Sequence, residues 1–155
     1  MKRVLFTLVF ASFGMLLWAQ QSNDYIELMR SVIKTEKKAA ISEVMELSTA
    51  EADLFWPLYN EYNEKRYVVN TKLVKLIEEY AANYSKMNDE LAKEYWTRNM
   101  NIDMELLKLE KSYYKKFLKV LNAQKAFRYF QAENKIENLI LAQLALDIPL
   151  LETIE

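Results

Sequence analysis

The chain has 155 residues, enough for one domain, and its 21 basic and 22 acidic residues leave no basic excess of the kind that nucleic-acid-binding proteins show. It contains no histidine and no cysteine, which excludes zinc sites built on these ligands, thiol catalysis and disulfide bonds. A single glycine, Gly14, is too few for phosphate-binding loops or the tight turns of β-rich folds. We therefore expect an all-α protein that is not an enzyme and that binds no nucleotide, nucleic acid, metal or other cofactor.

The N-terminal residues have the three-part pattern of a secretory signal peptide. Lys2 and Arg3 are basic, residues 4–17 form an apolar run, and the small Ala19 precedes a polar stretch. This pattern predicts a signal peptide over 1–19, one helical domain over 20–155, and a periplasmic protein with no membrane span after cleavage. The alternative is an uncleaved N-terminal anchor. A lipoprotein is excluded because no cysteine can carry the lipid.

Two helices are expected before the middle of the chain. Asn23 or Asp24 can cap the first, whose apolar positions run from Tyr25 to Met45. The second begins at Ser48, which with Glu51 forms a capping-box pattern. Apolar residues then recur every three or four positions for about 35 residues, which is the spacing of one helix face. The apolar positions of this face are Phe55, Leu58, Tyr62, Val69, Leu73, Leu76, Tyr80 and Tyr84. Pro57 is expected to kink this helix.

A polar turn over residues 85–89 precedes a third helix, for which Asn88 or Asp89 is the expected cap. Asn122 is the expected cap of a fourth helix that ends at Asp147. Pro149 disfavours helical backbone at the residue before it, so the tail is expected to be extended. The predicted fold is all-α with four helices: a long antiparallel hairpin kinked at Pro57 and shorter N- and C-terminal helices.

The third helix carries more apolar surface than one partner helix can cover. Its first apolar row faces the hairpin partner, and a second row lies about 100° around the helix. The second row has two interpretations: the aromatic side chains fill the core, or the row binds a client, a partner or a second subunit. The candidate binding residues are Trp96, Met100, Leu107, Tyr114 and Leu118, with Trp56, Tyr67 and Val74 as a side row on the second helix.

Charge is segregated along the predicted hairpin. Residues 43–64 carry six acids and no base, whereas residues 108–128 carry seven bases against Glu110. The helical wheel turns Asp53, Glu61 and Glu64 away from the apolar seam, together with the lysines, so we expect few direct ion pairs in the hairpin. The basic residues over 108–128 form either a solvated face or a site for an acidic partner. Its candidate binding lysines are Lys115, Lys116 and Lys119, with Lys108 and Lys111 on the same face.

Acidic pairs provide no catalytic site in this interpretation. Glu133 and Glu137 share a face, but pairs at this spacing occur on most solvated helices. The Glu-x-x-His ligand pairs of carboxylate-bridged metal bundles need histidine, which the chain lacks.

Short motifs in this chain resemble those of a known family. Leu47-Ser48-Thr49-Ala50-Glu51 is similar to the Leu-Thr-x-x-Gln motif of the Spy/CpxP family of periplasmic chaperones and stress proteins, and a weaker copy lies at Leu121, Asn122 and Gln124. Phe55-Trp56-Pro57-Leu58-Tyr59, the segment 130–135 and Ile148-Pro149-Leu150 resemble an exported branch of that family.

The resemblance implies a thin, curved helical homodimer of the cell envelope that shields unfolded or partly folded proteins without ATP. Metal binding is not carried over, because relatives that bind metal use histidine-rich segments. One alternative is a regulatory protein that binds the envelope domain of a sensor kinase or of a sigma-factor control system. Another is a structural coiled-coil component, which Pro57 disfavours.

Overall fold

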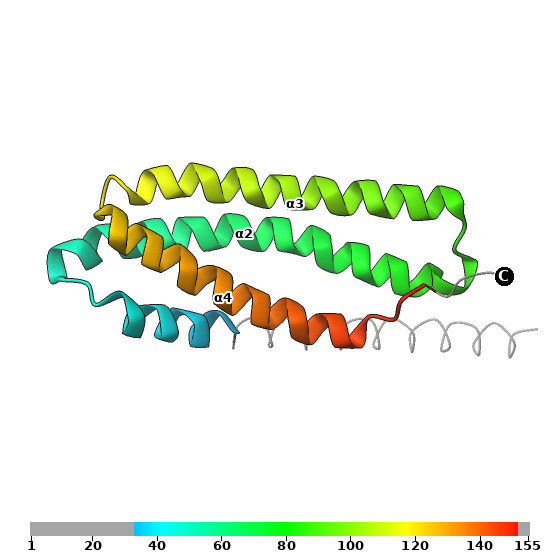
Figure 1. Cartoon of the computed structure of the whole chain (residues 1–155), viewed down its shortest axis with the longest axis horizontal. Helices are drawn as coiled ribbons and strands as arrows, with labels where there is room; N and C mark the ends of the chain where they lie inside the picture. Colours follow the sequence, from blue (N-terminus) through cyan, green and yellow to red (C-terminus); the bar gives the residue numbers. More distant parts are fainter. Residues whose placement is uncertain (1–32, 152–155) are drawn as a thin grey trace, which may run out of the picture. The chain divides into compact units, whose positions relative to one another are not determined.

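A computed structural model describes residues 33–151 of the chain, and most of this range is helical (Figure 1). Residues 33–45 are helical, and the elements that follow are α2 (Thr49–Asn83), the short 3-10 helix η1 (Tyr84–Lys86), α3 (Asp89–Phe117) and α4 (Ala123–Asp147). These residues form four α-helices and no strand, so the predicted all-α class is confirmed. The expected signal peptide over 1–19 and the expected cap at Asn23 or Asp24 lie outside the described residues.

The chain divides into two compact units, Met1–Glu43 and Val44–Glu155. The described part of the first unit, residues 33–43, is helical. The second unit contains α2, η1, α3 and α4.

Polar side chains cap the three long helices at the positions that the sequence predicts. Ser48 Oγ accepts a hydrogen bond from the Glu51 amide at 3.4 Å, and the Glu51 carboxylate accepts one from the Ser48 amide at 2.9 Å. The Asn88 and Asn122 side chains each accept a bond at 2.9 Å from the amide three residues further on. Each cap satisfies a donor that the helix itself leaves without a partner.

α2 continues without a break through Pro57 and ends at Asn83, close to the predicted length. The proline lacks an amide hydrogen, so it cannot donate the helical hydrogen bond to the Asp53 carbonyl. The kink expected at this point remains a prediction.

α2 and α3 pack against each other along an apolar seam. Val69 and Leu76 of α2 are buried with Ile102 of α3, and the partly buried Leu73, Tyr95 and Leu106 flank them. Burying a side chain of this size stabilises the fold by about 1.5–3 kcal/mol. Pairs further along show the antiparallel direction of the helices: Tyr62 with Tyr113, Lys72 with Glu105, and Glu79 with Arg98.

An aromatic cluster fixes the N-terminal half of α4 against the other two helices. The centroid of the Tyr129 ring lies 4.6 Å from that of Phe117 on α3 and 5.3 Å from that of Phe55 on α2. Phe130 lies 5.8 Å from Tyr62. The rings meet at tilted or edge-on angles, which aromatic pairs prefer. The aromatic cluster consists of Phe55, Tyr59, Tyr62, Tyr113, Phe117, Tyr129 and Phe130.

The expectation that Glu61 points away from α3 is wrong. Its carboxylate accepts hydrogen bonds from Tyr113 Oη at 2.5 Å and from Lys116 Nζ at 3.1 Å. Bonds from Tyr113, then Lys116 and Lys65, lower the pKa of Glu61 to about 2. A helical wheel places a residue by its backbone position alone. A long side chain extends beyond that position, so it can reach a partner across the seam on the neighbouring helix. Asp53 and Glu64 are exposed, as the wheel predicts.

The capping box at the start of α2 predicts a dependence of stability on pH. Hydrogen bonds from the Lys125 side chain and then from Ser48 lower the pKa of Glu51 from 4.5 to about 2. Glu51 therefore stabilises the fold above its unfolded-state pKa, and this contribution is lost as pH falls from about 4.5 towards about 2. In urea titrations the stability gap between the wild type and Glu51→Gln should be largest above this window and close within it.

The Lys125→Met background is the control for this experiment. The stability gap caused by Glu51→Gln should shrink there, because Lys125 provides the largest part of the pKa shift. An unchanged gap would show that Lys125 contributes little and that Glu51 acts through its bonds with Ser48, and a gap that does not depend on pH would contradict the lowered pKa of Glu51.

Candidate binding groove

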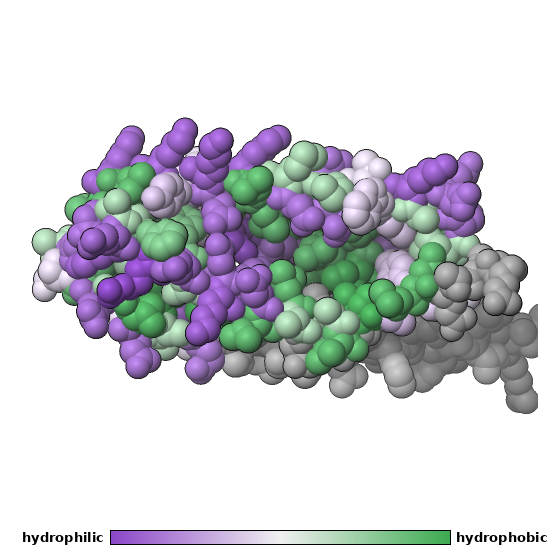
Figure 2. All heavy atoms as spheres, in the orientation of Figure 1, coloured by the Kyte–Doolittle hydropathy of each residue, from purple (hydrophilic) through white to green (hydrophobic). Residues whose placement is uncertain are grey.

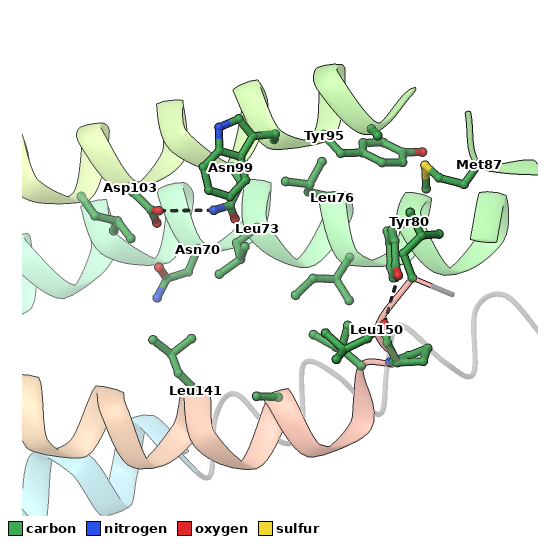
Figure 3. A pocket seen from close by; sticks show the side chains of 18 of the residues that line it. Asn70, Leu73, Leu76, Tyr80, Met87, Tyr95, Asn99, Asp103, Leu141 and Leu150 are labelled. Atoms are coloured by element: carbon green, nitrogen blue, oxygen red, sulfur yellow. Dashed lines mark hydrogen bonds between the residues drawn. The ribbon is translucent and has the colours of Figure 1, made fainter. Parts of the chain in front are cut away.

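A groove lies between α2, α3 and the C-terminal half of α4. Its volume is about 620 Å³, which is in the range of small-molecule sites. The apolar seam of α2 and α3 lines it with Leu73, Leu76 and Leu106, and Leu141 faces them from α4 (Figure 3). Figure 2 shows the hollow as a hydrophobic area between α3 and α4. The groove exists because the aromatic cluster holds one half of α4 against the hairpin while the other half stands away from α2 and α3.

The segment after α4 closes one end of the groove. Ile148 has φ −97° and ψ 113°, so the backbone is extended before Pro149, as the sequence predicts. Tyr80 donates a hydrogen bond to the Pro149 carbonyl at 3.0 Å, and Tyr84 donates one to the Leu150 carbonyl at 2.7 Å. We call residues 148–151 the C-terminal strap. It joins the ends of α4 and α2, and its side chains are part of the groove wall (Figure 3).

The opposite end of the groove is polar. Asn99 and Asp103 of α3 are hydrogen-bonded to each other at 3.3 Å, and Asn70 of α2 lies near them (Figure 3). Asn70 Nδ2 donates to Glu137 at 3.4 Å, whereas its Oδ1 is buried without a hydrogen-bond partner. The groove thus has an apolar body and a polar end with an unused acceptor.

A buried ionic network adjoins this polar end, and two of its members, Arg66 and Glu137, line the groove. The Arg66 side chain is 8% exposed, and its Nη2 lies 3.0 Å from Glu137 while its Nε lies 3.8 Å from Glu133, which is fully buried. Arg66 Nη1 also donates to Tyr62 Oη at 3.0 Å. The network joins α2 to α4 directly beside the aromatic cluster.

Burial and charge act in opposite directions on these groups. Burial lowers the pKa of the Arg66 guanidinium, but Tyr62, Glu137 and Glu133 outweigh it, so the pKa lies above its usual range. Burial raises the pKa of Tyr62 to about 12, and burial together with Glu133 raises that of Tyr129 well above its usual value. The tyrosines therefore remain neutral and Arg66 remains charged at neutral pH.

The second row on α3 is exposed along much of its length. The side chain of Trp96 is 68% exposed and that of Leu107 is 64% exposed, and Met100 and Leu118 are also exposed. Trp96 also lines the groove. Tyr114 is half-buried, with its ring against Phe130 of the aromatic cluster. Met104 was not among the predicted binding residues, but it is exposed between Met100 and Leu107.

The other candidate residues are divided between surface and core. Trp56 is half-buried against the rings of Phe55 and Tyr59, Val74 is half-buried, and Tyr67 is exposed. The α2 residues Trp56, Tyr67 and Val74 do not join the α3 row or the groove lining. Lys115 and Lys119 are exposed, whereas Lys116 is engaged with Glu61 and lies 4.2 Å from the centre of the Tyr113 ring.

The capping residues lie at the opposite end of the unit from the strap. Leu47 is half-buried beside the Ser48–Glu51 cap, and Leu121 is buried. Gln124 is exposed and is the second residue of α4, so it does not occupy the position from which a capping box is completed. These residues set where α2 and α4 begin, and none of them lines the groove.

The expectation that Glu133 and Glu137 lie on a solvated helix face is wrong. Both belong to the network around Arg66, which was not among the predicted features. A signal was present, because Arg66 follows Tyr62 by four positions on the apolar face of α2 and Glu133 follows Tyr129 by four on that of α4. Charged residues within the apolar faces of two helices predict a buried ion pair.

The groove can hold an apolar molecule next to polar groups. In residues 33–151 no group of three acidic side chains is placed to hold a metal ion. Over the same part of the chain no helix has both the length and the apolar character needed to cross a bilayer. Comparison of the chain with protein-family models, curated proteins and solved structures gives no match.

The buried network predicts a large difference between two arginines. Arg66→Met leaves two carboxylates beside the core without their cation and should lower the free energy of unfolding by about 3–5 kcal/mol. Arg98→Met removes a more exposed pair with Glu79 and should cost less than about 1 kcal/mol. Urea denaturation followed by circular dichroism measures both. Equal losses would mean that Arg66 has no special structural role.

Proposed function

We propose that the protein is an ATP-independent holdase or stress-response protein of the cell envelope, similar to the Spy/CpxP family. It binds unfolded or partly folded proteins through an apolar and basic helical surface. The observation that supports this most directly is the exposed α3 row, which consists of Trp96, Met100, Met104, Leu107 and Leu118. Exposed apolar side chains that follow one helix face are typical of an interaction surface.

The composition of the row suits partners of varied shape. Methionine side chains are flexible and adapt to irregular apolar surfaces, and tryptophan provides a large contact area. Met100 and Met104 lie between Trp96 and Leu107 along about three turns of α3. This arrangement supports a tolerant binding surface more than one that matches a single partner.

Lysines lie next to the row on α3 and in the turn that follows it. Lys108, Lys111, Lys115 and Lys119 are exposed, and hydrophilic side chains project from the C-terminal half of α3 in Figure 2. A basic band beside an apolar row favours capture of acidic clients first by charge and then by apolar contact. The first step depends on salt because exposed charges are screened.

The groove favours a second candidate, the regulatory protein. A bounded cavity with a polar end can take one protruding side chain of a matched partner, such as the envelope domain of a sensor kinase or of a sigma-factor control system. A regulator of this kind would bind one membrane partner and leave the aggregation of unrelated proteins unchanged.

The holdase proposal predicts that the protein, at a near-equal molar ratio to its client, slows the aggregation of each of two unrelated denatured proteins without ATP. Met104→Ser with Leu107→Ser should weaken this suppression several-fold, because both side chains are exposed and neither lines the groove. Replacing Lys111, Lys115 and Lys119 with glutamine should slow capture by about threefold to tenfold, and more at low salt. Light scattering measures both effects.

Exposed leucines outside the row provide the matched control. Leu54 on α2 and Leu139 on α4 are about as exposed as Leu107. Leu54→Ser with Leu139→Ser should leave suppression unchanged. If this pair weakens suppression as much as the α3 pair, the α3 row is not the binding surface. Suppression of neither client would contradict the holdase proposal.

We also propose that two chains associate, since exposed apolar side chains such as Val68 and Phe127 lie outside the α3 row. Light scattering of the purified protein should then give about twice the mass of one chain, which is 18.4 kDa before any cleavage. The mass of a single chain over the working concentration range would exclude the dimer.

A further inference from the structure

We propose that the groove binds a single-chain amphiphile, with its alkyl chain against the apolar body and a cationic, hydrogen-bond-donating head at the polar end. This site is separate from the lysine-flanked part of the α3 row, and it goes beyond the proposed function. The two surfaces share Trp96.

The apolar body has the size and lining that an alkyl chain needs. The cavity of about 620 Å³ is lined over most of its length by aliphatic and aromatic side chains from α2, α3, α4 and the strap. Leu73 and Leu76 face Leu141 across it (Figure 3). Each methylene transferred from water to such a lining raises affinity about threefold to fourfold.

The two ends of the groove differ, and this difference favours a ligand with one polar head. The strap, held by Tyr80 and Tyr84, closes the end near Met87 with Pro149 and Leu150. Asn70, Asn99 and Asp103 gather at the other end (Figure 3). A polypeptide passing through the groove would need its polar backbone accepted at both ends, whereas an amphiphile places its tail at the strap and its head at the polar end.

The charges at the polar end determine the kind of head. The groove is lined there by one guanidinium, Arg66, and by two carboxylates, Asp103 and Glu137, a net charge of −1. Arg66 is already paired with Glu137 and Glu133, so it is not available to an anionic head. Asp103 is exposed, and its carboxylate accepts a hydrogen bond from the neutral Asn99. The acidic excess favours an ammonium head over a carboxylate or sulfate.

Asn70 adds a specific need for a donor. Its Oδ1 is buried and has no hydrogen-bond partner, and its side chain extends from α2 into the space between α2 and α4 (Figure 3). A buried acceptor without a partner is costly, and a donor supplied by a ligand removes that cost. An ammonium carries three donors, so it can supply one to Asn70 and still interact with other acceptors at the polar end.

The test is calorimetric titration of the full chain with dodecylamine and with laurate, both below their micelle concentrations. These ligands have the same chain length and opposite head charges at neutral pH. Dodecylammonium should bind one per chain and at least tenfold more tightly than laurate. Shortening the chain from dodecyl to decyl should weaken binding about tenfold. Dodecyltrimethylammonium, which is cationic but has no donor, should bind several-fold more weakly than dodecylammonium.

Two alanines of α4 provide a matched pair of variants. Ala145 lines the groove, whereas Ala142, three positions earlier, does not, and both are exposed, so a larger side chain should not disturb folding. Ala145→Phe should weaken dodecylammonium binding at least tenfold, and Ala142→Phe should leave it unchanged. Asp103→Asn should reduce the preference for dodecylammonium over laurate several-fold.

Three outcomes would overturn the inference: no saturable binding, laurate bound as tightly as dodecylammonium, or equal effects of the two alanine substitutions. The aggregation assay of the proposed function is independent of all three. A protein that suppresses aggregation but fails these titrations keeps the holdase proposal and loses the amphiphile site. A protein that passes them but leaves aggregation unchanged keeps the site and loses the holdase proposal.

Discussion

The meeting of α4 with the α2–α3 hairpin at the aromatic cluster is the constraint on which the rest of the described unit depends. Tyr129 and Phe130 sit among Phe55, Tyr62 and Phe117, and five of the seven rings in the cluster are essentially inaccessible to solvent. A chain without cysteine has no disulfide to supplement this packing. Because the cluster holds one half of α4, it also determines where the other half leaves the hairpin and the groove begins.

The network around Arg66 makes this junction polar on one side. An arginine suits the position because its planar group can approach Glu133, Glu137 and Tyr62 at once, which the single ammonium of a lysine cannot do with the same geometry. Buried ion pairs of this kind contribute little net stability, but breaking one is costly. The network therefore fixes the position of α4 along α2 more than it adds to the stability of the unit.

Local signals in the sequence predicted much of the fold, because they act within a few residues. The serine and asparagine caps define the starts of α2, α3 and α4, and Pro149 accounts for the extended strap. The groove was not predicted, since it depends on how far α4 stands from the hairpin, a distance between elements that periodicity does not contain. Glu61, Glu133 and Glu137 were misplaced because a helical wheel treats a charged side chain as solvated and ignores partners on other helices. The second apolar row on α3 was predicted because it is a property of one helix, but its exposure was not, since the pattern allowed the row either to fill the core or to bind a partner.

The order of contacts along the chain has a consequence for how the molecule folds. α2 and α3 are neighbours in sequence, so their seam closes a short loop and can form early. The strap bonds join residues 66 and 69 positions apart and rest on two tyrosine hydroxyls, a much smaller attachment than the aromatic cluster. The C-terminal half of α4 is therefore the part that can detach and reattach while the hairpin stays folded. Such partial opening would give a bulky molecule a way into the cavity without unfolding the domain.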